Sequence, residues 1–249
     1  MAHPSDMTRR TSPEVAAALK NGQTTAIVVL GAQEQHGAHL PLATDSLWGA
    51  RLAEMIAERI GGAFVAPVVA VGYSPEHMRF PGTITLRAET WGAVVEDYVA
   101  SLETHGFTRI LLLASHGGNY APLANELPGL RERHPNVELV AYTDLLALVD
   151  AAGEVAGRYG VTADEAGAHA GEWETSMMLA VEPSSVHRDR EEVGFMGALG
   201  PVLDQIIDEG IQTVAPNGIL GDPAKASAEH GQAYLERVAD LFAAYLRAS

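Results

Sequence analysis

The chain of 249 residues contains no cysteine. Disulfide bonds, thiolate nucleophiles and sulfur-ligated zinc sites are therefore all excluded. Any metal ion in this protein must be held by the nitrogen atoms of histidine and the oxygen atoms of aspartate and glutamate.

Basic and aromatic residues are also scarce. The sequence has 16 lysines and arginines against 32 aspartates and glutamates, which gives a formal net charge of −16. Such a charge repels nucleic acid backbones and anionic lipid surfaces, so neither is an expected partner. Aromatic residues make up 6% of the chain and hydrophobic residues 47%. We therefore expect a core of alanine, valine, leucine and isoleucine.

Long hydrophobic runs are missing as well. The first twenty residues, MAHPSDMTRRTSPEVAAALK, hold no apolar stretch of signal-peptide length. Nowhere in the chain do about 18 apolar residues follow one another, as a membrane-spanning helix would require. We therefore expect a protein of the cytoplasm.

Short apolar runs are present instead, at residues 26–30, 64–71, 110–114 and 137–142. Their continuous apolar character indicates strands that are buried on both faces. Helical spacing lies between them, at 47–60 and 94–102, and again at 177–181 and 234–245 in a less regular second half. This order predicts one domain over residues 1–249, an α/β fold of three layers, with a mostly parallel central sheet between helices.

Chemically active side chains follow the first apolar run. Glu34 and His36 are two residues apart and face the same side of an extended segment. The carboxyl ends of strands are where α/β sheets bind ligands, so this place favours a metal site. Asp45 directly precedes a helical pattern, where it is either a metal ligand or the N-cap of the helix. We expect His39 to orient a ligand or contact a substrate.

A second cluster, SHGGN at residues 115–119, follows the run at 110–114. Its two glycines allow a close approach of the backbone, as in a site loop. His116 is either a metal ligand or a partner of neighbouring carbonyl groups. The presence of Glu34, His36 and Asp45 near another strand end favours the metal.

A third cluster, GAHAGEWETS, covers residues 167–176. His169 and Glu172 are three residues apart and share one face of a helix. We assign Glu172 to the metal and Glu174 to the orientation of a ligand. His169 is the candidate general acid and base, with a surface histidine near a turn as the alternative. The predicted catalytic residues are thus His169, Glu172 and Glu174.

The predicted metal ligands are Glu34, His36, Asp45, His116 and Glu172. Such a set of nitrogen and oxygen donors suits two divalent ions of Zn, Mn or Fe and fits Ca or Mg poorly. Two cations bridged by an aspartate can activate a water molecule and polarise a carbonyl group, and amide hydrolysis needs both actions. The loop at 73–83 is expected to line the pocket. Its Glu76 and His77 could be further ligands, but neither is assigned to the metal because five ligands are already named.

Several segments together resemble the creatininase (creatinine amidohydrolase) family, namely GAQEQHGAHLPLATD, SPEHMRFPGT, SHGGN, HAGEWETS and GILGDPAKAS. By this resemblance Glu34, His36, Asp45 and His116 fall on the metal positions of the family, with Asp45 as the bridging carboxylate. His169 falls on its catalytic histidine. The resemblance also implies a two-metal site, a three-layer α/β fold and a hexamer.

The chain departs from the creatinine-hydrolysing enzymes of that family in two respects. Those enzymes carry a carboxylate where this chain has Gly118, so the second metal needs another ligand, and Glu172 is the predicted substitute. They also use tryptophans around the substrate, which the stretches at 141–144 and 165–169 lack. Creatinine is therefore not the expected substrate.

These observations predict a metal-dependent amidohydrolase that cleaves an amide, cyclic amide or formamide C–N bond of a small molecule. The family also includes a deformylase of a formylamino-pyrimidine nucleotide and a peptidase of mycofactocin maturation. The SHGGN, ETS and GDP-containing segments resemble the peptidase branch at least as well as the creatinine branch. A peptidase that trims a short precursor peptide stays an alternative, as do a phosphoester hydrolase and a non-catalytic, metal-stabilised binding protein.

Overall fold

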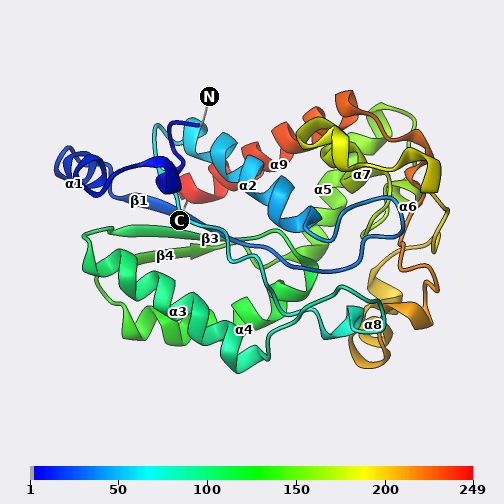
Figure 1. The fold of residues 1–249 in the computed structure, drawn as a ribbon, viewed down its shortest axis with the longest axis horizontal. Coiled ribbons are helices and arrows are strands. Elements are labelled where there is room, and N and C mark those ends of the chain that lie inside the picture. The colour runs from blue at the N-terminus through cyan, green and yellow to red at the C-terminus, as the bar shows by residue number, and fades with distance from the viewer. Residues whose placement is uncertain (1–2, 249) are drawn as a thin grey trace.

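A four-stranded, all-parallel sheet forms the middle layer of the protein in the computed structural model, which describes residues 3–248 (Figure 1). The strands are β1 (Thr25–Leu30), β2 (Phe64–Val65), β3 (Arg109–Ala114) and β4 (Glu138–Ala141), in the order β2-β1-β3-β4. Each strand lies on one of the predicted apolar runs. The predicted parallel sheet is therefore confirmed.

Helices cover both faces of the sheet and confirm the three-layer prediction. In Figure 1, α2 (Thr44–Arg59) and α9 (Ala228–Ala248) lie above the sheet, whereas α3 (Ala88–Thr104) and α4 (Tyr120–Arg133) lie below it. Each helix buries one apolar stripe, which for α9 includes Tyr234, Val238 and Phe242. Two further helices, α5 (Leu145–Arg158) and α7 (Glu172–Val181), pack against α9.

The second strand is shorter than predicted. The apolar run covers residues 64–71, but only Phe64 and Val65 form the strand, and Val69 makes a single bridge to Leu30. Pro67 lies between these two contacts and has no backbone N–H to donate to a neighbouring strand. The run therefore turns into an irregular segment that still lies beside β1.

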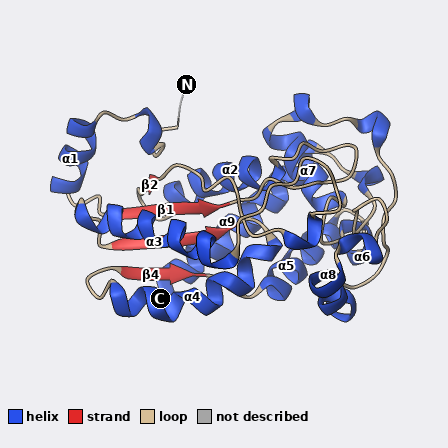
Figure 2. Ribbon diagram, turned by 60° about the horizontal axis from the view of Figure 1, so that its bottom comes forward, coloured by secondary structure: helices blue, strands red, loops and turns tan. Residues whose placement is uncertain are grey.

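The strands β1 and β3 pair along their full length, with Thr25 opposite Arg109 and Leu30 opposite Ala114. Because they are parallel and in register, both end at the same level of the sheet. The loops that leave them emerge side by side, on the side of the arrowheads in Figure 2. This edge carries the clusters that the sequence singled out.

The half of the molecule beyond that edge is irregular, as predicted. It contains α7, the short helices α6 (Ala163–Ala166) and α8 (Leu203–Glu209), and several single 3-10 turns. Its apolar residues Ile206, Ile211, Ala215 and Leu220 form a small cluster apart from the main core. The N-terminal α1 (Ser12–Lys20) lies at the opposite end. Among the described residues, no helix is long and apolar enough to cross a membrane.

Candidate metal centre

The loops that follow β1 and β3 are held together by one buried amide. The side-chain nitrogen of Asn119 donates to the carbonyl oxygens of Leu30 and Gly31, both at 3.0 Å. Its side-chain oxygen accepts the backbone N–H of Tyr73, also at 3.0 Å. Three loops are thereby fixed to one another, and the polar side chains that they carry point into a common interior.

Two groups of possible metal ligands share Asp45. One consists of Glu34, Asp45 and His116, and the other of His36, Asp45 and Glu174. His116 Nδ1 lies 3.1 Å from Glu34 Oε2 and 3.7 Å from Asp45 Oδ2. His36 Nε2 lies 3.4 Å from Asp45 Oδ1 and 3.8 Å from Glu174 Oε2. The two oxygens of Asp45 thus face different groups, the arrangement in which one carboxylate bridges two cations.

We call these five residues, Glu34, His36, Asp45, His116 and Glu174, the metal cluster. Several of its polar atoms are buried without any hydrogen-bond partner, namely Glu34 Oε1, Glu34 Oε2, His36 Nε2 and Asp45 Oδ2. Buried polar atoms without a hydrogen-bond partner are costly, and a bound cation would satisfy those of Glu34, His36 and Asp45 together. The residues therefore fit a metal site, and their nitrogen and oxygen donors suit Zn, Mn or Fe.

The histidines at the cluster are oriented by backbone carbonyl oxygens, which can only accept a hydrogen bond. His36 Nδ1 donates to the Glu34 carbonyl at 3.2 Å, and His116 Nε2 to the Tyr73 carbonyl at 3.0 Å. His169 Nε2 likewise donates to the Gln35 carbonyl at 2.7 Å. In each neutral ring the other nitrogen then carries a lone pair and faces the cluster, as in proteins that bind metal through histidine.

The Gln35 side chain fixes a fourth ring, that of His77. Gln35 Oε1 accepts the Gly37 N–H, so the amide nitrogen is the atom that faces Gly218 O at 3.0 Å and His77 Nδ1 at 2.9 Å. Its two hydrogens are used there, which leaves none for the 3.1 Å contact with His169 Nε2. His77 must therefore carry its proton on Nε2, which lies 3.5 Å from Glu34 Oε1. In this tautomer Nε2 has no lone pair to offer a metal, although Nε2 lies with Glu34 and Glu76 in a further group of possible metal ligands.

Burial and neighbouring charges shift the pKa values of the site residues in different directions. Burial lowers the pKa of His77 to about 4 and that of His169 well below its ordinary value. Burial also opposes the charge on His36 and His116, but neighbouring carboxylates outweigh it. Asp45 raises the pKa of His36 to about 9, and Glu34 raises that of His116 to about 10. Burial raises the pKa of Glu174 to about 7.

The structure reverses the predicted places of the two glutamates on α7. The Glu172 carboxylate faces α9, where it accepts hydrogen bonds from Tyr234 Oη and, at 2.8 Å, from His230 Nδ1. It also accepts the hydroxyl of Ser176 at 2.7 Å. Glu172 is therefore turned away from the metal cluster, whereas Glu174 belongs to it. The two residues are two positions apart on a helix, which points them about 200° apart in direction.

The structure also places Asp45, His39 and Glu76, for which the sequence left more than one role open. Asp45 is the second residue of α2 rather than its N-cap, which is Ala43. His39 is buried against the Thr175 hydroxyl at 2.9 Å and does not join the metal cluster. Glu76 is buried beside the cluster, with Oε1 3.6 Å from His116 Nε2, and forms a further group of possible metal ligands with Glu34 and His77.

Sequence reasoning did not identify several residues that build the site. Gln35, Asn119 and Tyr73 hold the loops and rings in place, and Tyr234 and His230 hold Glu172. Gln35 stands between two predicted ligands and Asn119 closes a predicted motif, so their positions were the available signal. Tyr234 and His230 carried no such signal in the sequence, because a tyrosine and a histidine on an amphipathic helix are ordinary packing residues.

Comparisons with known proteins agree with this geometry. A family model described as Creatininase: Creatinine amidohydrolase matches residues 8–246. A mycofactocin precursor peptide peptidase of Mycolicibacterium smegmatis is 33% identical over 211 residues, which cover 83% of this chain and 77% of that protein. A creatinine amidohydrolase of Pseudomonas putida is 30% identical over 237 residues, covering 90% of this chain and 88% of that protein.

Solved structures of similar proteins share the whole architecture. A structure described as creatininase Mn superimposes with a TM-score of 0.78 and 25% identity, over 98% of this chain and 97% of that chain. A creatininase variant of the Zn-Zn type superimposes with a TM-score of 0.80 and 25% identity, over 99% and 98%. These similarities extend from the sheet through the irregular half that carries α7 and α8.

Proposed function

We propose, from the premise that this chain belongs to the creatininase family, that it is a metal-dependent amidohydrolase that cleaves a C–N bond. The observation that carries the proposal is the pair of buried donor groups that share Asp45. The proposed ligands of one cation are Glu34, Asp45 and His116. Those of the other are His36, Asp45 and Glu174, with Glu174 in the place first assigned to Glu172.

Bound there, zinc, manganese or iron would activate a water molecule and polarise the carbonyl group of the amide. The protein must still move protons, because the leaving nitrogen has to be protonated before it departs. His169 is suited to this task. Its Nε2–H is committed to the Gln35 carbonyl, so Nδ1, 3.7 Å from Glu34 Oε1, is free to accept a proton and return it.

His77 and Gln35 act on this chemistry indirectly. His77 Nε2 lies 3.5 Å from Glu34 Oε1, and Gln35 holds that ring with its proton on Nε2. Gln35 also provides the carbonyl that orients His169. One residue thus positions both a proposed metal ligand and the proposed proton carrier, which keeps their separation fixed.

A peptidase that trims a short precursor peptide is the second candidate. The relative from Mycolicibacterium smegmatis supports it, since it is 33% identical and is described as a peptidase of that kind. Both candidates hydrolyse an amide bond and would use the same cations and the same His169. The space beside the metal cluster, rather than the cluster itself, must therefore separate them.

The test begins with the full chain, stripped with a chelator and reloaded with zinc or manganese. We expect hydrolysis of at least one member of a panel of formamides, lactams and short peptides, which is lost on stripping and regained with about two ions per chain. Loss of stability on stripping, without turnover of any amide, would favour the non-catalytic alternative. Full activity of a His36→Ala and Asp45→Ala double variant would contradict the proposal.

A single substitution separates proton transfer from metal binding. His169→Asn should keep both ions, measured by elemental analysis, and lower kcat by about 10²- to 10⁴-fold, the usual contribution of a general acid and base. His105→Asn, a change of the same kind at the exposed end of α3, serves as the control and should leave kcat unchanged. Loss of the ions in His169→Asn would instead make this residue a ligand.

We also propose that residues 1–249 act as one domain and assemble into a cytoplasmic hexamer, as the family resemblance implies. The mass of one chain is 26.3 kDa. Light scattering coupled to gel filtration should therefore give about six times this mass. A monomeric mass would contradict the assembly without affecting the metal centre.

A further inference from the structure

A pocket of about 310 Å³ opens directly onto the metal cluster. Glu34, Asp45, His116, His169 and Glu174 line its inner end. A group bound in this space would lie beside any amide whose carbonyl faces the cluster. Its volume is at the lower end of the range for small-molecule sites. The walls of this pocket would therefore contact the chemical group attached to the scissile amide.

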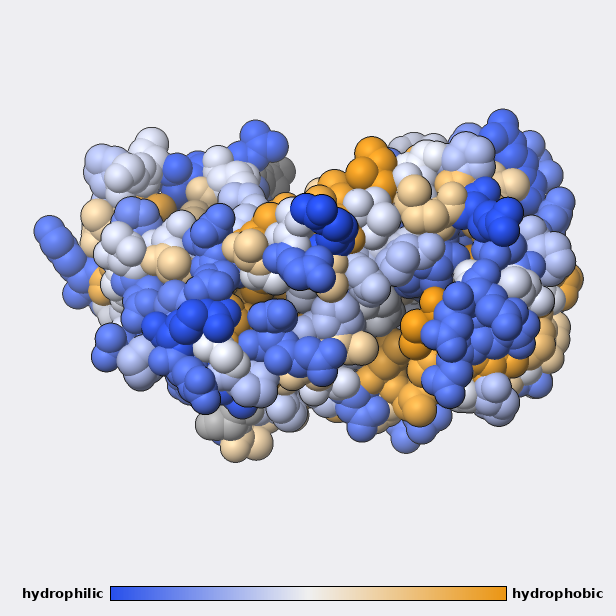
Figure 3. Space-filling model, turned by 90° about the horizontal axis from the view of Figure 1, so that it is seen from below, coloured by the Kyte–Doolittle hydropathy of each residue, from blue (hydrophilic) through white to orange (hydrophobic). Residues whose placement is uncertain are grey.

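The walls away from the cluster are mostly aliphatic. One of them, which we call the α8 wall, consists of Leu199, Leu203, Ile206, Ile207, Ile211 and Leu220. Facing it are Tyr120, Ala121, Pro122 and Ala124 of α4, together with Leu145 of α5. In Figure 3, apolar side chains gather around a hollow on the side of the molecule that carries α8.

The α8 wall is built separately from the main core. Ile206, Ile211 and Leu220 belong to the small second apolar cluster, with Leu199 packed against them. This cluster comes from the irregular half of the chain, whereas the metal ligands Glu34, Asp45 and His116 come from the loops after the strands and the start of α2. The wall can therefore vary in shape and polarity without moving the ligands.

Apart from its histidines, the charged residues that line the pocket all carry negative charge. None of its lining residues is a lysine or an arginine, and the acidic ones are Glu34, Asp45, Glu76 and Glu174. Two divalent cations would carry four positive charges, which these four carboxylates can balance. A phosphate or carboxylate group on the substrate would then lose its hydration in the apolar part of the pocket without gaining a cationic partner.

We propose that this pocket binds an apolar, uncharged side chain or ring next to the scissile amide, and that the α8 wall determines this specificity. The inference rests on the proposed function and narrows its substrate to amides with an aliphatic or aromatic substituent. It disfavours substrates whose adjacent group is a nucleotide phosphate or an acidic side chain.

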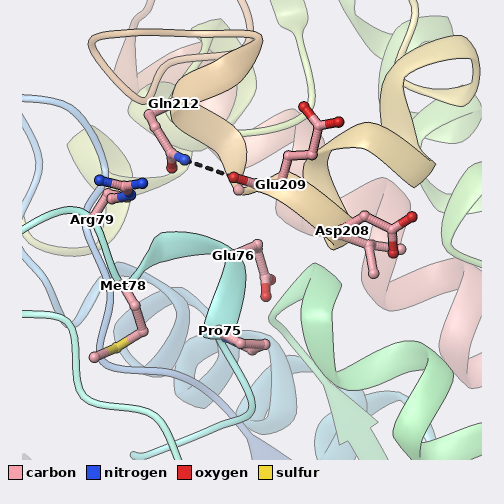
Figure 4. Close-up of a pocket in the computed structure, with 9 residues that line it drawn as sticks. Pro75, Glu76, Met78, Arg79, Asp208, Glu209 and Gln212 are labelled. Atoms are coloured by element: carbon pink, nitrogen blue, oxygen red, sulfur yellow. Dashed lines mark hydrogen bonds between the residues drawn. The ribbon is translucent and has the colours of Figure 1, made fainter.

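Ile207 offers the sharpest test of the α8 wall. It lines the pocket and is 56% exposed, so a substitution there leaves the core intact. It also borders a second cavity of about 300 Å³, together with Glu76, Arg79, Asp208 and Gln212 (Figure 4). In Figure 4 the Glu76 side chain projects from the 3-10 turn at 75–77, and Glu76 lines both cavities. A long cationic side chain at 207 can therefore enter the pocket near Glu76.

The experiment compares two ligands that share one metal-binding group. N-acetyl-leucine hydroxamate and N-acetyl-aspartate α-hydroxamate are titrated into the zinc-loaded full-length protein by calorimetry. We expect the leucine compound to bind at least about tenfold more tightly, since one buried aliphatic group gives this degree of discrimination. Ile207→Lys should reduce this preference by about tenfold or reverse it. Gln205→Lys, an exposed residue of α8 outside the pocket lining, should leave it unchanged.

The outcomes distinguish a failure of the apolar pocket from a failure of the proposed metal centre. Equal affinity for the two hydroxamates would overturn the apolar pocket and leave the proposed metal centre standing. An unchanged preference in Ile207→Lys would remove Ile207 and the α8 wall as the determinant. Failure of both compounds to bind the zinc-loaded protein would overturn the metal centre first, and the pocket assignment with it.

Discussion

The two sides of the metal cluster are positioned by different means. Glu34, His36 and His116 lie on loops that leave β1 and β3, and the register of these paired strands fixes where the loops begin. Glu174 lies on α7 and His169 shortly precedes this helix, which packs along α9 rather than on the sheet. Backbone pairing places one side and side-chain packing places the other. The strand side is therefore rigid by construction, whereas the α7 side depends on contacts that substitutions can loosen.

Asp45 joins the two sides, so its loss should have the largest effect. Asp45→Asn removes one negative charge from both donor groups at once and leaves an amide that bridges two cations poorly. We expect activity to fall by at least about 10³-fold, because the polarisation supplied by two cations is worth several kcal/mol. Elemental analysis should show fewer than two ions per chain.

Asp150→Asn, at an exposed position of α5, is the matched control and should retain both ions and full activity. If Asp45→Asn also kept two ions and full turnover, Asp45 would not bridge the two sides. The Asp45 carboxylate would then be only a buried partner of His36 and His116.

The second comparison lies within α7, between two glutamates of opposite orientation. Glu174→Gln should weaken one cation site and lower activity by about 10- to 100-fold, with stability nearly unchanged. Glu172→Gln should keep both ions but lower the free energy of unfolding by about 1–3 kcal/mol, since the amide disturbs the bonds from Tyr234, His230 and Ser176.

Metal content, turnover and urea unfolding of the two variants measure this difference side by side. Loss of an ion in Glu172→Gln, with both ions kept in Glu174→Gln, would restore the assignment made from the sequence. The same pattern in both variants would show that α7 responds as a unit and that the orientations do not matter.

The sequence predicts the strand side well for a physical reason. Continuous apolar runs identify buried parallel strands, and the loops after parallel strands meet at one edge, so Glu34, His36 and His116 could be brought together without coordinates. The α7 side was harder. The prediction relied on the spacing of His169 and Glu172, but His169 precedes the helix, which begins at Glu172. Helical spacing therefore does not relate His169 to Glu172, and the sequence did not show which of Glu172 and Glu174 faces the cluster.

Packing partners explain the remaining errors. The carboxylate of Glu172 faces α9 because Tyr234 and His230 satisfy it there, and these residues are about 60 positions away in the chain. No local pattern reports such a contact. The short β2 differs from this case, because its cause is local. Pro67 stands in the sequence itself, and it ends the strand after Val65.

The glycines after β3 test how rigid the strand side is. A Cβ atom at Gly118 would lie 2.5 Å from the Tyr73 carbonyl oxygen and closer still to His116 Nε2, whereas one at Gly117 would meet nothing nearer than 3.7 Å. Gly118→Ala should therefore displace His116, lower stability by about 1–3 kcal/mol and weaken one cation site. Gly117→Ala is the matched control and should change neither. Equal stability and metal content in the two variants would mean that the loop yields at little cost.

The pH dependence of metal binding is the smallest of the expected effects, and it distinguishes the two cation sites. Despite burial, Asp45 raises the pKa of His36 to about 9 and Glu34 raises that of His116 to about 10 in the metal-free protein. Both rings therefore hold a proton at pH 7 that a cation must displace. Between pH 7 and 9, metal affinity should fall about tenfold at each site for every unit that the pH is lowered.

Below pH 7 the two cation sites should diverge. Glu174, whose pKa burial raises to about 7, also becomes protonated, so the affinity of the site that contains Glu174 should fall more steeply than that of the site that contains His116. Competition against a chelator across pH 6 to 9 measures both slopes. Glu174→Gln should remove the extra steepness and leave the affinity of the site that contains His116 unchanged. A pH-independent affinity would show that the rings are already neutral before the metal arrives, and parallel slopes below pH 7 would place Glu174 outside the coordination of either ion.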